Sequence, residues 1–399
     1  MEQTNKNIKQ FICQPYMNKL KLTILHNIIS PYRLPLFEEL SKKYDLCVYF
    51  CKANTKDRLW NTSLKNYTFK YKILSSLNIG PLVFNFFLLK ELFKNKSDCF
   101  IVAENPENAI STLTVFTIAK INKSKIILWS ERIDNKIVTL SHFKTSNNFF
   151  RNICYNFVKS VYKNYRKCLY SKSDVLLPLS SAAESYLKME GVDKKKIKRS
   201  IQIMPESILA KPTTTSISPE FKDKKVILSL GYLIKEKGVD TLIKAFNQLN
   251  RNDAVLMIAG AGDQEDSLKK LSNENNNIYF LGYVEETEKA NCFSSADIFV
   301  FTSHHDVWGF VVNEALYYGL PVISSDKACA SELIEDGKTG FVVKDNDIHE
   351  LAKRMEKLLN NQSLLVEMKE NIKKMNKSKL VDINTLVRTF EEAIRYALK

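Results

Sequence analysis

Residues Phe301–Ser325 read FTSHHDVWGFVVNEALYYGLPVISS, and this segment is the most informative part of the chain about its architecture. It begins in a short apolar run, crosses a polar loop, continues as a helical pattern from Gly309 and returns through Gly-Leu-Pro to another apolar run. Uninterrupted apolar runs are typical of parallel strands covered on both faces, and a helix between two such strands is the usual crossover. The segment therefore predicts one strand–helix–strand unit of a doubly wound sheet.

The same alternation of apolar runs and helical patterns continues on both sides of this segment. Further strand candidates lie at residues 21–25, 47–50, 99–103, 126–129, 174–178, 226–231, 254–260, 278–283 and 340–343. Between the two groups, residues 210–225 (AKPTTTSISPEFKDKK) lack apolar periodicity and form a candidate linker. The sequence predicts an α/β protein with two Rossmann-like, doubly wound domains that face each other across a cleft. Their expected bounds are 1–212 and 213–380, with a C-terminal helix at 381–399 that returns to the first domain.

The composition excludes several classes of protein. Of the 399 residues, 45% are hydrophobic, which excludes global disorder. The longest apolar stretch, Ile73–Leu89, is interrupted by Asn78, Gly80, Pro81 and Asn85, so no membrane-spanning helix is expected. The N-terminus lacks the apolar region of a secretory signal, and the scattered cysteines include no C-x-x-C pair. A cytoplasmic protein with reduced thiols and no metal site is therefore expected.

Two carboxylates in the opening segment are candidate ligand-binding groups. Asp306 lies in the loop, and Glu314 follows it by eight positions on the predicted helix. A helix that begins near Gly309 presents free N–H groups and a positive dipole end, which suit a diphosphate. Glu314 can then accept hydrogen bonds from sugar hydroxyls, and Asp306 can hold a second hydroxylated ring. The alternative is an ordinary crossover helix with surface carboxylates.

A second candidate segment, Ser229–Thr241 (SLGYLIKEKGVDT), directly follows the first strand of the second domain. Lys237 in this loop can reach a diphosphate in the cleft as a flexible point charge. The alternative is a solvated loop lysine.

These two segments resemble glycosyltransferase family 4, whose members are retaining enzymes of GT-B fold that use nucleotide-diphosphate sugars. Asp306 and Glu314 match the family's E-x7-E motif, with Asp replacing the first Glu and Trp308-Gly309-Phe310 between them. The resemblance implies that the first carboxylate contacts the donor sugar and the second contacts the ribose hydroxyls.

Lys237-Gly238 matches the family's G-R-L-x-x-x-K-G, in which Arg and Lys stabilise the diphosphate leaving group. Tyr232 stands in place of that Arg, so either Lys235 supplies the second positive charge or leaving-group stabilisation is weaker. The weaker matches are the G-x-G turn that ends at Gly262 and the segment beside the nucleobase at Tyr283 and Val284. The resemblance assigns Lys237 and Asp306 as catalytic residues, and Gly231, Tyr232, Lys235, Gly262, Tyr283, Val284, Trp308, Gly309, Phe310, Val311 and Glu314 as donor-binding residues.

The first domain is expected to hold the acceptor, and its candidate residues are less specific. After its first strand the chain lacks the family's Gly-rich loop, which leaves Asn27 and Ser30 as polar candidates. Arg33 either binds an acid group or caps a helix, and Glu104 follows the third predicted strand. Many family members carry a histidine after the fourth predicted strand that faces the donor sugar. In this chain Glu131 falls closest to that position, and His142 lies further along. Either side chain could orient a hydroxyl or shield positive charge at the anomeric carbon; the alternative is a surface residue.

The predicted function is transfer of a sugar, with retention, from a UDP- or GDP-sugar to a glycan or lipid-linked acceptor in polysaccharide or glycolipid biosynthesis. No cofactor and no metal are expected. One alternative is another enzyme on the same fold, such as an epimerase or a phosphorylase. The other is a non-catalytic scaffold with a degenerate donor site, for which Tyr232 is the best argument.

The net charge of +15 favours anionic partners, and much of the excess lies in the first half of the chain. Phe149–Tyr170 (FFRNICYNFVKSVYKNYRKCLY) contains no acid, and its pattern predicts a basic amphipathic helix. Such a helix either lies on an anionic membrane surface or packs on the core with a solvated basic face, Arg166 and Lys163 included. A peripheral position on the inner membrane face is expected, and no nucleic-acid motif occurs.

Overall fold

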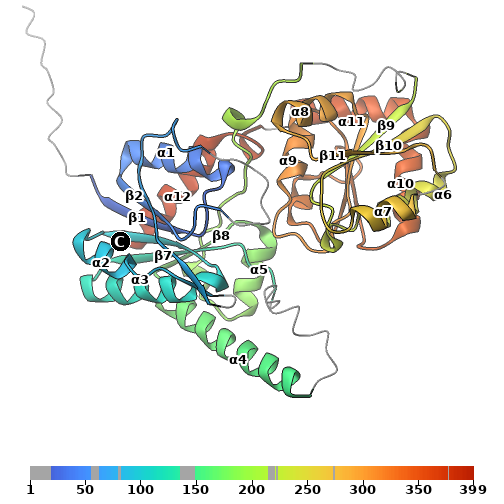
Figure 1. Cartoon of the computed structure of the whole chain (residues 1–399). Helices are drawn as coiled ribbons and strands as arrows, with labels where there is room; N and C mark the ends of the chain where they lie inside the picture. The colour runs from blue at the N-terminus through green and yellow to red at the C-terminus, as the bar shows by residue number, and fades with distance from the viewer. Residues whose placement is uncertain are drawn as a thin grey trace, which may run out of the picture.

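The computed structural model describes residues 19–54, 63–79, 82–134, 149–213, 221, 223–272, 275–375 and 377–399, with backbone only for 149–158. Within these ranges the chain forms two parallel six-stranded sheets, each at the centre of its own domain (Figure 1). Among the described residues, no helix combines the length and apolarity needed to cross a bilayer.

The first sheet has the strand order β3-β2-β1-β6-β7-β8. Its strands are β1 (Lys21–His26), β2 (Asp45–Phe50), β3 (Lys70–Ile73), β6 (Cys99–Ala103), β7 (Lys125–Ser130) and β8 (Val175–Pro178). The helices are α1 (Leu34–Lys43), α2 (Leu88–Lys94), α3 (Ala109–Asn122), α4 (Phe149–Lys172), α5 (Ser181–Met189) and α12 (Ile383–Leu398). One face of the sheet packs against α1 and α12, and the other packs against α2, α3, α4 and α5. Burial on both faces explains the uninterrupted apolar strands.

The second sheet repeats this arrangement with the order β11-β10-β9-β12-β13-β14. Its strands are β9 (Lys225–Leu230), β10 (Ala254–Ala259), β11 (Ile278–Gly282), β12 (Ile298–Phe301), β13 (Val322–Ser325) and β14 (Gly340–Val343). The helices are α6 (Val239–Leu249), α7 (Glu265–Leu271), α8 (Glu286–Ser295), α9 (Phe310–Tyr317), α10 (Ile348–Asn360) and α11 (Gln362–Lys374). The 3-10 turns η2 (Pro106–Asn108), η7 (Lys235–Lys237) and η8 (Cys329–Leu333) occupy loops.

In both sheets the strand order reverses beside the first strand, next to β1 in one domain and next to β9 in the other. Crevices for ligands form outside the carboxyl ends of strands at such a reversal. The predicted architecture of two Rossmann-like, doubly wound domains is confirmed by this topology.

The C-terminal helix α12 lies on the first domain, beside α1 and against β7 and β8 (Figure 1). Leu386, Phe390, Ala393 and Ala397 recur at helical spacing and are all buried there. The Phe390 ring meets Trp129 of β7 edge-on, with 5.1 Å between centroids. The chain therefore crosses back from the second domain to complete the core of the first.

Several elements differ from the prediction. The edge strand β3 and the antiparallel hairpin of β4 (Leu77–Ile79) and β5 (Leu82–Phe84) were not predicted, because β3 and β4 are exposed and each hairpin strand has only three residues. Arg166 does not belong to a solvated basic face of α4, because it is buried and donates to the Tyr186 hydroxyl.

Candidate active site

A cleft of about 1180 Å³ lies between the two domains at the carboxyl ends of both sheets. It brings together most of the residues predicted from the sequence. Those that line it are Asn27, Ser30, Arg33, Glu104, Glu131, Gly231, Tyr232, Lys237, Tyr283, Val284, Asp306, Trp308, Gly309, Phe310, Val311 and Glu314. Lys235 and Gly262 are not among its lining residues. His142 lies outside the described residues.

Lys237 and Asp306 form an ion pair at the second domain's side of the cleft. The Lys237 Nζ lies 2.5 Å from Oδ2 of Asp306, and both side chains are mostly buried. The other oxygen of Asp306 accepts from the backbone N–H of Trp308 at 3.1 Å, which fixes the carboxylate in the loop before α9. The two residues that the sequence assigns to catalysis are therefore direct partners.

The amino end of α9 opens onto the same region. Gly309 precedes the helix with φ of 103°, a conformation that L side chains rarely adopt, and an added Cβ would lie 2.8 Å from the Phe301 ring. Among the described residues, no side chain caps the first turn, whose residues Phe310 and Val311 line the cleft. Free N–H groups and the positive dipole end make this position suited to an anion.

Glu314, one turn along α9, is 1% exposed and forms a salt bridge with Lys289 of α8 at 2.6 Å. Glu286 holds the same ammonium at 2.9 Å. These two carboxylates raise the pKa of Lys289 above its usual value. Burial raises the pKa of Glu314, and Lys289 opposes that rise. Lys289 was missed from the sequence, because a lone lysine on a helical pattern gives no sign of its partner.

Across the cleft, Arg33 is 2% exposed, and its Nη2 lies 2.5 Å from Glu131. Its guanidinium also stacks over the Trp129 ring at 4.7 Å. Arg33 occupies the N-cap position of α1, but its side chain makes no capping hydrogen bond and binds the carboxylate of Glu131 instead. Gln202 donates to the same Glu131 oxygen at 3.1 Å, which makes Glu131 the centre of a polar cluster.

Glu104 is held from several sides at the end of β6. It accepts from Ser130 at 2.6 Å and from the Tyr170 hydroxyl at 3.1 Å, and Arg132 lies 3.4 Å away. The sequence did not predict Arg132, although it directly follows Glu131 after the end of β7. This carboxylate is therefore a rigid part of the cleft floor.

Two histidines that the sequence analysis did not single out also line the cleft. His305 of the second domain lies 3.1 Å from Asp134 of the first, so this pair joins the two domains. His26 ends β1, and its Nδ1–H donates to the carbonyl of Ile28 at 2.9 Å. Burial, with a contribution from nearby Arg33, lowers the pKa of His26 to about 3. His26 is therefore neutral at physiological pH.

The suggestion that Lys235 supplies a second charge to the diphosphate is not supported, because Lys235 is exposed on η7 outside the cleft lining. Gly262 has a packing role instead of a ligand-facing one. A Cβ at this position would lie 2.2 Å from the carbonyl oxygen of Leu233.

Comparisons with known proteins agree with this arrangement. Residues 211–375 match the family model "Glycosyl transferases group 1". An uncharacterized glycosyltransferase of Methanocaldococcus jannaschii is 26% identical over 381 residues, which cover 92% of this chain and 85% of that protein. The capsular polysaccharide biosynthesis glycosyltransferase CapM of Staphylococcus aureus is 28% identical over 163 residues, covering 39% of this chain and 42% of CapM.

Among solved structures, Anabaena HepE in complex with UDP and glucose superposes with a TM-score of 0.69. The alignment covers 94% of this chain and 99% of HepE at 15% identity, which shows a shared fold. The similarity to glycosyltransferases of group 1 therefore lies in residues 211–375, and the solved structures confirm the predicted GT-B fold over most of the chain.

Proposed function

We propose that this protein transfers a sugar, with retention and without a metal ion, from a UDP- or GDP-sugar to a glycan or lipid-linked acceptor. The observation that carries the proposal is the convergence of Lys237, Asp306 and the uncapped start of α9 on one side of the interdomain cleft. The cation suits a leaving phosphate, and the carboxylate suits a sugar hydroxyl. The free N–H groups suit a diphosphate.

In the proposed donor site, the diphosphate lies at the start of α9, and the ribose hydroxyls donate to Glu314. Tyr283 and Val284 line the cleft beside Glu286 and Lys289, where a nucleobase has apolar contacts. The UDP in the Anabaena HepE structure supports a uridine nucleotide. A GDP-mannose-dependent mannosyltransferase of Corynebacterium glutamicum is 35% identical over 146 residues, and this similarity supports a guanosine nucleotide as the alternative.

The geometry suggests how charge is handled when the bond between sugar and diphosphate breaks. Negative charge develops on the departing phosphate, and Lys237 moves from Asp306 toward that oxygen. Asp306 is then free to accept a hydrogen bond from a donor-sugar hydroxyl. Charge stabilisation by groups already in place is commonly a large part of catalysis. Tyr232 contributes a hydroxyl in place of a guanidinium, so Lys237 and the helix dipole carry most of this stabilisation.

The acceptor is proposed to enter from the first domain, where Asn27, Ser30, Arg33, Glu104 and Glu131 line the cleft. In a direct displacement with retention, its hydroxyl attacks the face of the sugar from which the diphosphate leaves, and the hydroxyl proton passes to the departing phosphate oxygen. We further propose a peripheral position on the cytoplasmic face of a membrane. The exposed lysines of α4, at 159, 163 and 167, support attraction to an anionic surface.

A panel of UDP- and GDP-sugars tests the proposal through release of free sugar and through the shift in melting temperature caused by UDP or GDP. One nucleotide of the pair is expected to raise the melting temperature, and its sugar conjugate is expected to be hydrolysed slowly without an acceptor. Absence of both effects for every donor would refute the proposal. Nucleotide binding without sugar release would instead favour the non-catalytic scaffold that Tyr232 suggests.

A further inference from the structure

The first domain exposes a group of large apolar side chains that its own core does not use. Six of them lie within 17 residues of sequence, from β4 through α2, and their exposed fractions range from 47% to 63%. Two more lie on α3. We call this set the apolar face: Leu77, Ile79, Phe86, Phe87, Leu89, Phe93, Ile110 and Leu113.

The sequence around α2 shows that this exposure is built into the fold. Leu88 and Leu92, spaced by four, are buried against the core beneath the helix. Phe86, Leu89 and Phe93 follow the same helical spacing on a different side and remain exposed. The segment is therefore apolar on two sides, and the second side stays largely exposed, although the Phe86 ring stacks on Phe84 of β5 with 6.3 Å between centroids.

The segment is also held firmly in place. The buried Asn85 side chain donates to the carbonyl of Cys51 at 2.9 Å and accepts from the Ser111 hydroxyl of α3 at 2.8 Å. Val83 of β5, two residues before Asn85, is also buried. Phe86 and Phe87 directly follow this anchored stretch, so their outward orientation is set by the fold.

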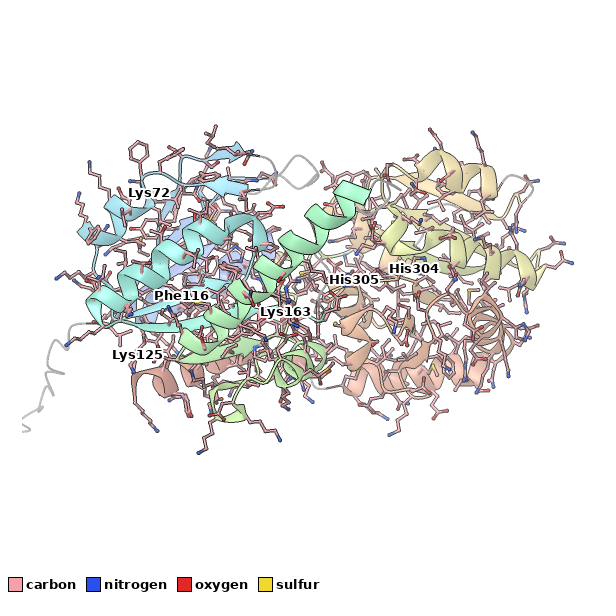
Figure 2. The ribbon with its side chains drawn as sticks, turned by 90° about the horizontal axis from the view of Figure 1, so that it is seen from below. Lys72, Phe116, Lys125, Lys163, His304 and His305 are labelled. Atoms are coloured by element: carbon pink, nitrogen blue, oxygen red, sulfur yellow. The ribbon has the colours of Figure 1, made fainter. Side chains whose placement is uncertain are left out.

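The apolar face extends toward the cleft along α3. Both β5 and α2 pack against α3, and β5 also contacts the turn η2, whose Pro106 and Glu107 line the cleft. Ile110 and Leu113 lie on the first turns of α3, directly after η2. Figure 2 shows the helices that carry Phe116 and Lys163, α3 and α4, side by side on this side of the domain.

The sequence that carries the apolar face is rich in lysine, although Lys70 is paired with Asp45 at 2.7 Å. Between residues 70 and 97 the sequence has five lysines and one acid, Glu91. Glu91 is already paired with Lys72 at 2.7 Å. Lys90 and Lys94 follow Phe87 at helical spacing, so an ammonium stripe runs beside the apolar stripe of α2.

We propose that the apolar face lies on an anionic lipid bilayer, with its Phe, Leu and Ile side chains in the boundary between headgroups and acyl chains. The lysine stems then run along the apolar surface while their ammonium groups reach lipid phosphates. Protein interfaces are commonly anchored by Trp and Arg, whereas this face is built from Phe, Leu, Ile and Lys. Its composition therefore fits a lipid surface better than a protein partner. The proposal deepens the proposed function, because it places the acceptor side of the cleft next to the membrane.

Flotation of the full-length protein with vesicles tests this inference, using phosphatidylcholine alone and an equal mixture with phosphatidylglycerol. The wild-type chain is expected to float with the mixed vesicles, and salt should weaken the binding. The variant Phe86→Ser/Phe87→Ser/Phe93→Ser is expected to lose about tenfold or more in partitioning. The control Met189→Ser/Val366→Ser removes apolar residues that are exposed elsewhere and should bind as wild type.

A second pair of variants separates this face from α4. Lys90→Glu/Lys94→Glu is expected to weaken vesicle binding more than Lys159→Glu/Lys163→Glu. Equal flotation of the wild type and the triple serine variant would overturn the inference. The inference would also be overturned if the wild type did not bind vesicles and the triple serine variant differed from it in oligomeric state. The face would then join protein chains. Donor hydrolysis without vesicles is measured in parallel and should be the same in these variants as in the wild type. A wild type that hydrolyses no donor would count against the proposed function and not against the membrane surface.

Discussion

The ammonium of Lys237 and the carboxylate of Asp306 are 2.5 Å apart, although 69 positions separate them in the sequence. Each residue was assigned a catalytic role from a different motif, and the fold makes them one unit. The two charges neutralise each other in a mostly buried position. A bound diphosphate must compete with Asp306 for the same ammonium, and this competition leads to two predictions.

Replacing Lys237 with Met removes the cation nearest the expected leaving group. Donor hydrolysis is expected to fall about 10²- to 10³-fold, the usual loss for one preorganised group that stabilises developing charge. The variant Lys235→Met, two positions away but outside the cleft lining, is the matched control and should keep its rate. Equal losses in both variants would show that the loop as a whole matters, and not the ammonium in the cleft.

Asp306→Asn keeps the shape of the side chain and removes its charge. Lys237 is then free to pair with a phosphate, so UDP or GDP, whichever binds, should bind several-fold more tightly. Turnover should fall, because the carboxylate that accepts from the donor sugar is lost. Isothermal titration gives the first value and donor hydrolysis gives the second. Weaker nucleotide binding together with slower turnover would contradict a competitive role for Asp306.

Lys289 neutralises the buried carboxylate of Glu314, so Lys289→Met should destabilise the fold by about 3–5 kcal/mol at neutral pH. The loss should be smaller at lower pH. A raised carboxyl pKa in the folded state means that protonation relieves the buried charge and stability falls as pH rises. The double variant Lys289→Met/Glu314→Gln should recover much of the stability but not nucleotide binding. Urea unfolding gives the free energy of unfolding of each variant. If Lys289→Met were as stable as the wild type, Lys289 would not neutralise Glu314.

Glu131 was predicted to face the donor sugar, whereas the structure shows it bound to Arg33 and Gln202. If Glu131 acts by holding Arg33, then Glu131→Gln and Arg33→Met should slow transfer by similar factors. The double variant should be little slower than either single variant. If the loss in the double variant equals the product of the two single losses, Glu131 has an independent role at the sugar. The melting temperature of all three variants separates loss of folding from loss of activity.

His26 predicts a pH dependence of stability. Its pKa is about 3 in the folded protein, against an ordinary value of 6.5. The unfolded chain therefore takes up a proton first, and stability should fall by about 1.4 kcal/mol per pH unit as pH decreases below 6.5. Urea unfolding of His26→Leu should show a shallower dependence than wild type. The same substitution at the exposed His349 controls for loss of a histidine, and an unchanged slope in His26→Leu would contradict the assignment.

Much of the fold could be predicted because its signals are local. Uninterrupted apolar runs mark strands that helices cover on both faces, and Gly309 marks the start of α9. The edge strand β3 and the β4–β5 hairpin escaped prediction because their residues are largely exposed. Burial is what produces the apolar pattern, so elements outside the core leave little trace in sequence.

The sequence was enough to predict two doubly wound domains and to point to candidate donor-side residues at the ends of β9 and β12, since strand ends and helix starts depend on neighbouring residues. The tertiary structure alone shows that Lys237 pairs with Asp306, Lys289 with Glu314 and Arg33 with Glu131. It also shows which apolar side chains around α2 remain outside the core. These pairings join residues from separate elements, so they depend on how the crossovers pack and how the two domains meet, which no local pattern encodes.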